Sequence, residues 1–417
     1  MQKESTQKRL RLFSLIALLL SISFSLIIAE LILRARDWYC ATQKGTAPQE
    51  YRNNPYEFSA TRHHRLIPNV RYRHKELEFD YVWANNSLGM RDRERSPRSD
   101  PQNFRILFLG DSIVQWYGVP LAQTMVSYLE ESLNQPRREK TIEVLNGGIF
   151  GYSPLLEYLY LLELMPLVSP NMVIVGFTLG NDVGDDYFYA QQARTNIIDG
   201  SLSFEQLKWP WDYCNEVVDG LKSKSSSVVK EESRTYSHLA LFKKYIMPLL
   251  LKSRIISTIR ELRDRWQKER DYRERNKLIE QLKEDRKYDI RINLGLVKYP
   301  VTDWKKRLEY WQLSQTYISK IHGLCQTRGV PMVLVVFPET EGNLFMEPYE
   351  ILDKLGTELS IPVIQLLLEL RALSPEKQKK LFYELDGHWN VKGNRLVATI
   401  INRKLRSLNL LPPEQKY

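Results

Sequence analysis

The sequence predicts an α/β protein with a parallel sheet covered by helices on both faces. Strand-like and helix-like segments alternate along the chain, which is the order that builds parallel βαβ units. The strand-like runs are short and apolar, as expected of strands buried on both faces. With 417 residues, 43% of them hydrophobic, the chain is long enough for one sizeable domain plus attachments.

The elements of this sheet and its helices can be placed in order. Strands are predicted at 105–109, 143–146, 172–177, 331–337 and 361–365. Helices are predicted at 124–134, 154–165, 307–328 and 391–406. Ser153-Pro154 is a typical cap and first-turn pair for the second of these helices.

Residues 183–303 are predicted to be a mostly helical insertion. A helical apolar stripe is formed by Ile255, Ile259, Leu262 and Trp266. A solvated helix that packs on the core through this stripe is the favoured interpretation. The alternative is a lid or a partner-docking arm.

The N-terminus carries an apolar segment. Leu12–Ala29 is uncharged, and Glu30 and then Leu31–Leu33 follow, so residues 12–33 are about long enough to span a bilayer. The run exceeds the ~7–15 apolar residues of a cleaved signal peptide, and no clear cleavage site follows. The sequence therefore favours a signal-anchor over residues 1–36. A single-pass membrane protein is expected, with its main domain extracytoplasmic, in the periplasm or at the cell surface.

Residues 37–103 are predicted to be a neck and a small pre-domain, and residues 409–417 a short tail. Aromatic residues alternate at Tyr72, Phe79, Tyr81 and Trp83, which indicates a hairpin or edge strands. Arg91 and Arg93 are expected to be solvated at the surface rather than to contact a ligand.

Composition excludes several classes of function. The net charge of +10 is not accompanied by a zinc finger, a helix-turn-helix or a stacking-aromatic motif, so no nucleic-acid partner is expected. Anionic lipid headgroups or acidic polysaccharide explain the charge better. Cys40, Cys214 and Cys325 form neither a disulfide framework nor a metal-ligand pattern. The pair His63-His64 also lacks accompanying ligands, and we expect no metal and no cofactor.

One strand-like run ends in a polar turn that suggests chemistry. Ile106–Leu109 leads directly into Gly110-Asp111-Ser112, so Ser112 is expected at the carboxyl edge of the sheet, where ligands bind. Alone, such a triplet is more often only a turn. Three further blocks follow strands or precede a helix: Asn146–Gly151, Leu179–Asp182 and Asp386–Asn390.

With these four blocks in this order, residues 104–408 resemble the SGNH hydrolases, also called GDSL esterases/lipases, of the membrane-anchored bacterial type. The resemblance implies a flavodoxin-like three-layer α/β/α sandwich. It implies Ser112 as nucleophile, His388 as general base and Asp386 as the acid that orients the base. It also implies an oxyanion hole made by the backbone N–H groups of Ser112 and Gly151 and the side chain of Asn181.

These residue types suit acyl transfer. A serine hydroxyl needs a neighbouring base, imidazole is the natural base near neutral pH, and a carboxylate fixes the tautomer of the imidazole. The last block departs from the family pattern Asp-x-x-His, because Leu385 stands at the usual position of the acid. Asp386, two residues before His388, is therefore the predicted acid, and Glu384 is its nearest rival.

The predicted function is that of a serine ester hydrolase acting on an acyl ester at the cell envelope, with O-acetyl and lipid esters as candidate substrates. One alternative is an O-acyltransferase that modifies an envelope polysaccharide with the same triad. A second alternative is a non-catalytic envelope interaction protein that retains the fold. The sequence leaves open the acyl group and its acceptor.

Overall fold

The computed structural model describes residues 54–76, 78–97, 100–135, 138–196, 201–207, 304–338 and 346–414, with shorter stretches within 13–35 and 253–273. The sheet at its centre is made of β5 (Asn103–Gly110), β6 (Thr141–Gly148), β7 (Met172–Thr178), β10 (Met332–Phe337) and β11 (Val363–Gln365). All neighbouring strands pair in parallel, in the order β11-β10-β7-β5-β6. Numbered along the chain, this is the flavodoxin-like order 2-1-3-4-5.

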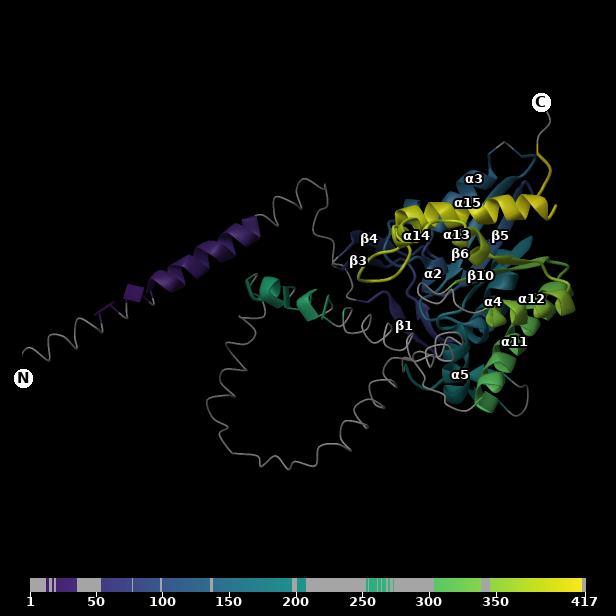
Figure 1. The fold of residues 1–417 in the computed structure, drawn as a ribbon, viewed down its shortest axis with the longest axis horizontal. Helices are drawn as coiled ribbons and strands as arrows, with labels where there is room; N and C mark the ends of the chain where they lie inside the picture. Colours follow the sequence, from purple (N-terminus) through teal and green to yellow (C-terminus); the bar gives the residue numbers. More distant parts are fainter. Residues whose placement is uncertain are drawn as a thin grey trace, which may run out of the picture. The chain divides into compact units, whose positions relative to one another are not determined.

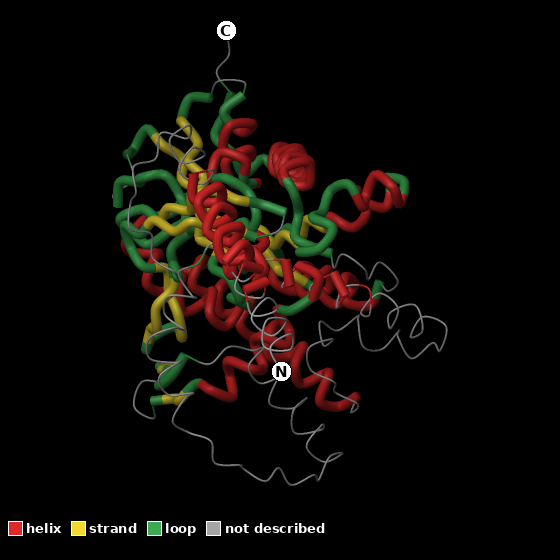
Figure 2. Tube along the Cα trace, turned by 90° about the vertical axis from the view of Figure 1, so that its left-hand side faces the viewer, coloured by secondary structure: helices red, strands yellow, loops and turns green. Residues whose placement is uncertain are grey.

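Helices cover both faces of the sheet (Figures 1 and 2). One face carries α4 (Pro154–Val168), α5 (Asp182–Gln192), α11 (Trp304–Thr327) and α12 (Glu347–Leu359). The other carries α3 (Met125–Leu133), α13 (Leu366–Arg371) and α15 (Val391–Ser407). Successive residues of β5 alternate between the two cores, with Leu107 in the first and Phe108 in the second. The predicted parallel sheet with helices on both faces is therefore confirmed.

The predicted insertion contributes its first residues to this core. Residues 183–192 form most of α5, where Val183 and Tyr189 are fully buried. A short antiparallel pair follows, β8 (Arg194–Thr195) with β9 (Leu202–Ser203). The parts of the insertion at 208–252 and 274–303 lie outside the described residues.

Two antiparallel hairpins precede the sheet and belong to the same compact unit. They are β1 (Tyr56–Ser59) with β2 (His63–Leu66), and β3 (Arg71–Lys75) with β4 (Asp80–Ala84). The second hairpin confirms the prediction from the alternating aromatic residues. Phe79 and Trp83 are buried in the same core as Leu107 of β5, so the hairpins pack onto the sheet domain.

The expectation for Arg91 is wrong. This side chain is 1% exposed, and its guanidinium donates to the backbone carbonyls of Gln115, Trp116 and Val119. Five N–H donors on one planar group allow a single buried arginine to satisfy several carbonyls of a tight loop. Arg93, in contrast, is exposed and forms an ion pair with Glu130.

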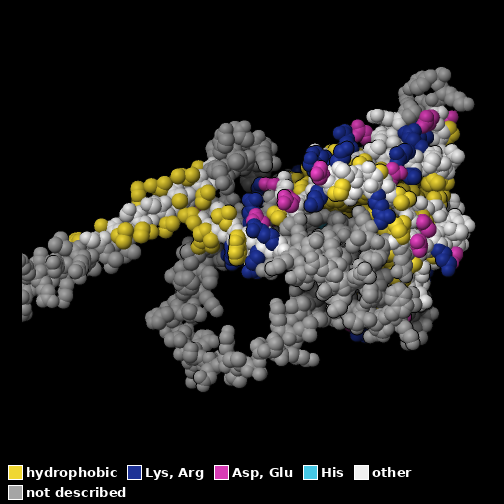
Figure 3. All heavy atoms as spheres, viewed as in Figure 1, with side chains coloured by type: hydrophobic (Ala, Val, Ile, Leu, Met, Phe, Trp, Pro, Cys, Tyr) yellow, Lys and Arg dark blue, Asp and Glu magenta, His cyan; other side chains and the backbone are white. Residues whose placement is uncertain are grey.

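A second compact unit contains the N-terminal segment and part of the insertion. Residues 20–35 are helical and expose apolar side chains (Figure 3), whereas residues 12, 15, 16 and 19 lie outside the described residues. Among the helices that could be assessed, none is both long and apolar enough to cross a membrane. Within this unit, Glu30 accepts hydrogen bonds from the Ser253 hydroxyl and the Ile255 N–H.

The apolar stripe of the insertion lies in this second unit as well. Ile255 is half-buried. Ile259, Leu262 and Trp266 are about 60% exposed. Within this unit the Arg270 guanidinium lies over the Trp266 ring, 5.4 Å from its centroid. That the stripe packs on the core stays a prediction.

Candidate active site

Ser112 lies at the point where β5 ends and the short helix α2 (Ser112–Gln115) begins. Asp111 caps this helix, because its carboxylate accepts a hydrogen bond of 2.8 Å from the Ile113 N–H. The chain order of the sheet reverses between β5 and β7, which makes this edge a switch point where such sheets bind ligands. Ser112 therefore occupies the place that the sequence predicted for it.

Three glycines allow α2 to lie directly on the ends of three neighbouring strands. A Cβ on Gly110 would stand 2.3 Å from Cγ2 of Val114, and one on Gly176 would stand 2.8 Å from the same atom. A Cβ on Gly148 would stand 2.1 Å from the backbone nitrogen of Gln115. Since no side chain could be accommodated at these positions, the glycines fix how closely the nucleophile turn packs on the sheet.

His388 joins Ser112 to Asp386. Its Nε2 lies 3.0 Å from the Ser112 Oγ, and its Nδ1 lies 2.7 Å from Oδ1 of Asp386. An ionised carboxylate can only accept, so Nδ1 carries the ring proton and Nε2 presents a lone pair to the hydroxyl. This is the arrangement in which an imidazole can take the proton of an attacking serine.

Asp386 can reach the ring of His388, only two residues later, because of the backbone conformation of Gly387. This residue adopts φ = 83°, in the left-handed region that favours glycine. The turn is closed by hydrogen bonds from the Gly387 N–H to the Tyr383 carbonyl and from the Tyr383 N–H to the His388 carbonyl. Asn390 then caps α15 by accepting from the N–H groups of residues 392 and 393. Together these contacts bring the Asp386 carboxylate back to the ring.

Asp386 is held in its ionised form. Burial raises its pKa, but the hydrogen bond and charge of His388 outweigh this effect, and the net pKa is lowered. Trp389, next to His388 in the chain, is 1% exposed, and its ring centroid lies 4.4 Å from that of Phe382. The rival acid Glu384 is exposed.

The peptide that precedes Gly151 is held by a histidine that the sequence did not assign to the site. His64 Nε2 lies 2.8 Å from the Phe150 carbonyl oxygen. Because a trans peptide is planar, the Gly151 N–H must point in the opposite direction. On the other side, the Tyr189 hydroxyl donates to the Gly151 carbonyl at 2.8 Å. The orientation of this predicted oxyanion donor is thereby fixed from two sides.

His64 is paired with His63, and both are fully buried. Burial, together with the neighbouring His63, lowers the pKa of His64 well below its usual value, so the ring is neutral. Its Nε2 proton is donated to the Phe150 carbonyl, and its Nδ1 accepts from Nδ1 of His63 at 2.8 Å. The adjacent histidines His63 and His64 thus form a buried hydrogen bond with each other, and His64 supports the Phe150 peptide.

Asn181, the third predicted oxyanion donor, stands at the N-cap position of α5. Its side-chain amide donates to Oδ2 of Asp185 at 2.9 Å. It also lies near enough to Asp111, the residue before Ser112, to lower the pKa of that carboxyl, which burial raises. The buried Asp185 carboxylate thereby orients the carboxamide through one of its two N–H groups.

A buried acidic cluster, formed by Asp111, Glu157, Asp182 and Asp186, lies behind this edge of the sheet. Burial is the main cause of the raised pKa of each member, and repulsion within the cluster adds to it for Glu157 and Asp182. Asp182 accepts a hydrogen bond of 2.8 Å from the Thr178 N–H, as expected of a structural residue. Across the described ranges, no group of histidine, cysteine or acidic residues has an arrangement that could hold a metal ion.

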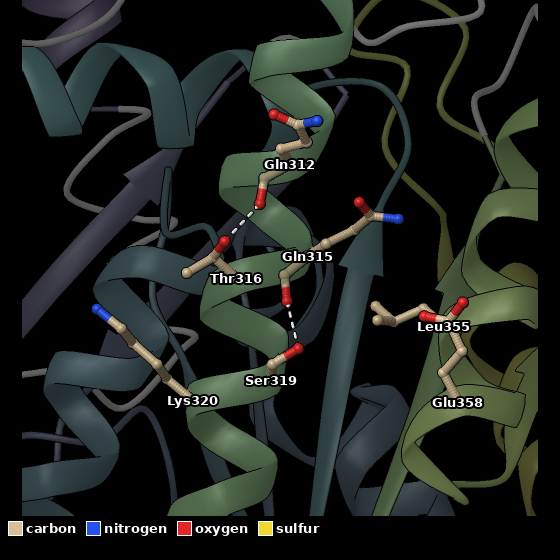
Figure 4. A pocket seen from close by; sticks show the side chains of 7 residues that line it. All are labelled: Gln312, Gln315, Thr316, Ser319, Lys320, Leu355 and Glu358. Carbon is tan, nitrogen blue, oxygen red and sulfur yellow. Dashed lines mark hydrogen bonds between the residues drawn. The ribbon is translucent and has the colours of Figure 1, made fainter.

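A hollow of about 670 Å³ lies between α11 and α12 (Figure 4). None of its lining residues belongs to the predicted site. Thr316 and Ser319 on its wall donate their hydroxyl hydrogens to carbonyls of their own helix. The hollow is therefore a polar groove between helices, separate from Ser112 and His388.

Comparisons with known proteins give only remote similarities. No family model and no curated protein sequence matches the chain. Among solved structures, it is similar to a two-domain esterase (CEX) active on acetylated mannans, with TM-score 0.38 and 10% identity over 77% of this chain. The chain spans 53% of that esterase.

Two further matches cover nearly all of the other protein. The lipase/acylhydrolase from Enterococcus faecalis matches with TM-score 0.36 and 13% identity over 75% of this chain and 100% of that one. The esterase EstA from Pseudoalteromonas sp. matches with TM-score 0.37 and 10% identity over 73% and 97%. Similarities this remote do not identify the activity, which has to be inferred from the residues of the chain itself.

Proposed function

We propose that this chain is a serine ester hydrolase that works through an acyl-enzyme on Ser112. One observation carries the proposal: the hydrogen-bonded series from the Ser112 Oγ through His388 to Asp386, at the carboxyl edge of a parallel sheet. Nucleophile, base and orienting acid are each within hydrogen-bonding distance of the next, which is the geometric requirement for this chemistry.

The reaction proceeds in two halves. Ser112 Oγ attacks the ester carbonyl carbon while His388 Nε2 takes the hydroxyl proton and then passes it to the departing alcohol. Water attacks the resulting acyl-serine, again giving its proton to Nε2. The carboxylic acid leaves, and the proton returns to Ser112. Asp386 keeps the ring in the correct tautomer and stabilises the imidazolium formed in each half.

The negative charge that develops on the carbonyl oxygen requires fixed donors. We assign this role to the backbone N–H groups of Ser112 and Gly151 and to the Asn181 carboxamide. Removal of one such donor typically costs about 3–4 kcal/mol of transition-state stabilisation. The contacts of His64 and Tyr189 with the peptides around Gly151 support its assignment.

We also propose a location and a substrate class. Residues 12–33 anchor the chain in a membrane, and the catalytic domain faces the extracytoplasmic side, where it acts on O-acetyl or lipid esters of the envelope. The support is the uncharged run Leu12–Ala29. N-terminal sequencing of membrane-extracted protein should find residue 1 or 2. A mature N-terminus beyond residue 33 would contradict the anchor.

Substitution Ser112→Ala tests the activity. We expect hydrolysis of p-nitrophenyl acetate to fall by at least about 10³-fold and labelling by a fluorophosphonate probe to disappear, while circular dichroism stays unchanged. Ser319→Ala is the matched control, because that hydroxyl bonds only within its own helix. Full activity of a folded Ser112→Ala protein would refute the proposal.

The same assays separate the alternatives. A hydrolase releases the acyl group to water, whereas an O-acyltransferase would transfer it to an added polysaccharide acceptor in preference to water. A non-catalytic interaction protein would show neither turnover nor probe labelling in the wild type.

A further inference from the structure

Glu78, in the turn between β3 and β4, binds the loop that carries the proposed acid. Its Oε1 accepts from the N–H of Glu384 at 2.7 Å. Its Oε2 accepts from the N–H groups of Leu385 at 2.9 Å and of Asp386 at 2.8 Å. Three successive backbone donors thus converge on one carboxylate of a distant hairpin.

These three hydrogen bonds to one carboxylate are a strong contact for the few atoms involved. Hydrogen bonds to an ionised acceptor are roughly twice as strong as neutral ones, and successive N–H groups form a concave site for an anion. The third donor belongs to Asp386 itself. The contact therefore fixes the backbone from which the orienting carboxylate extends.

The hairpin also reaches the other side of the site. Tyr81 of β4 accepts a hydrogen bond of 3.1 Å from the Gly118 N–H, just after the nucleophile helix. Tyr383 donates to the Gly118 carbonyl at 2.9 Å, and its ring lies 5.2 Å from that of Phe79. The hairpin thus contacts both loops that flank Ser112 and His388.

We propose that Glu78 is a positioning residue for catalysis: it holds residues 384–386 so that Asp386 can orient His388. This inference rests on the proposed function. The loop needs an external support because Gly387 turns the chain sharply. In addition, the three N–H groups that donate to the Glu78 carboxylate point away from their own turn and toward the hairpin.

Three variants test this role. Glu78→Ala removes the acceptor, and Glu78→Gln keeps the shape but leaves one neutral oxygen. Asp80→Asn is the matched control, because it removes one charge of the Arg73–Asp80 ion pair in the same hairpin. We expect Glu78→Ala to lower kcat about 10- to 100-fold with little change in KM, the scale of loss caused by a misplaced catalytic group. Glu78→Gln should lie between Glu78→Ala and the wild type, and Asp80→Asn should behave as the wild type.

Chemical rescue distinguishes positioning from general destabilisation. Added formate can occupy the space vacated in Glu78→Ala and accept from the same three N–H groups. It should restore part of kcat in that variant and have no effect on Asp80→Asn. Equal loss of activity in Glu78→Ala and Asp80→Asn, without rescue, would overturn the inference.

Hydrogen exchange provides a readout that does not depend on activity. The amides of Glu384, Leu385 and Asp386 should exchange faster in Glu78→Ala than in the wild type, and formate should slow them again. Unchanged exchange would refute the positioning role even if the Ser112→Ala result supports the esterase. Conversely, an active Ser112→Ala protein would refute the esterase, while the exchange data would still decide whether Glu78 holds the loop.

Discussion

At the scale of single residues, the decisive feature is how a carboxylate reaches a histidine only two positions away. The left-handed turn at Gly387 makes the contact possible, and Asp386 lies 2.7 Å from the ring, whereas Glu384 donates its backbone N–H to Glu78. We therefore expect Asp386→Asn to lower kcat by about 10⁴-fold, because the ring would adopt the wrong tautomer. Glu384→Gln should remain near wild type. Steady-state kinetics on both variants check this, and the opposite order would disprove the assignment.

A second residue-scale prediction concerns the pH dependence of stability. Burial raises the pKa of Asp186 to about 7, although the nearby hydroxyls of Ser153 and Ser314, the second of which donates a hydrogen bond to Oδ2, lower it. An unfolded aspartate has a pKa of about 3.9, so between these values the folded chain binds a proton that the unfolded chain has lost. The contribution of Asp186 to the free energy of unfolding therefore falls as the pH rises from the unfolded to the folded pKa of this residue.

The variant Asp186→Asn removes this titration. In the wild type, the Leu155 N–H donates to Oδ1 of Asp186. The side-chain oxygen of the asparagine in the variant can accept the same hydrogen bond. Urea unfolding at several pH values between 5 and 8 should show that the free energy of unfolding depends less on pH in the variant. The stability of the variant relative to the wild type should therefore increase as pH rises. Parallel curves for the two proteins would mean that Asp186 is already ionised in the folded state.

Residue chemistry was predictable from sequence only where a local motif exists. The blocks around Ser112 and His388 are local, and the structure brings the Ser112 hydroxyl to 3.0 Å from the His388 ring. His64 and Glu78 carry no such signal. His64 meets a carbonyl 86 positions away, and Glu78 meets amides more than 300 positions away, so only the folded chain reveals them.

At the scale of elements, the nucleophile helix depends on glycines that belong to other strands. We expect Gly148→Ala to cost about 1–3 kcal/mol of stability by overpacking and to lower kcat about 100-fold, because α2 must shift. Gly323→Ala, in α11, is the control, since a Cβ there meets no atom within 4 Å. Denaturant unfolding and kinetics measure both effects. A neutral Gly148→Ala would contradict the packing described.

The predictability of the elements follows their composition. All five strands of the sheet were predicted because buried parallel strands are continuous apolar runs. Helix α5 was not predicted as a separate element. Its buried residues include Asp182, Asp185 and Asp186, which disrupt the apolar pattern. Buried acids of this kind are stabilised by tertiary contacts, which a local pattern does not record.

At the scale of the whole molecule, the region before the sheet belongs to the same compact unit as the sheet. Leu66, Trp83 and Arg91 belong to this region and are at most 2% exposed, so its removal would expose the apolar surface of the sheet domain that they cover. We expect a chain of residues 54–417 to fold and hydrolyse esters. A chain of residues 104–417 should aggregate or remain inactive, although it keeps every triad residue. Solubility, circular dichroism and ester turnover compare the two, and an active 104–417 chain would contradict this view.

The contact between Glu78 and residues 384–386 also imposes an order on events during synthesis. The hairpin emerges early, whereas the loop that it holds emerges some 300 residues later. The entropic cost of closing so long a loop rises only slowly with its length, but the contact cannot form before residues 384–386 have been made. Until residues 384–388 emerge, the strands and Ser112 can already be in place, while the proposed site still lacks its base and its orienting acid.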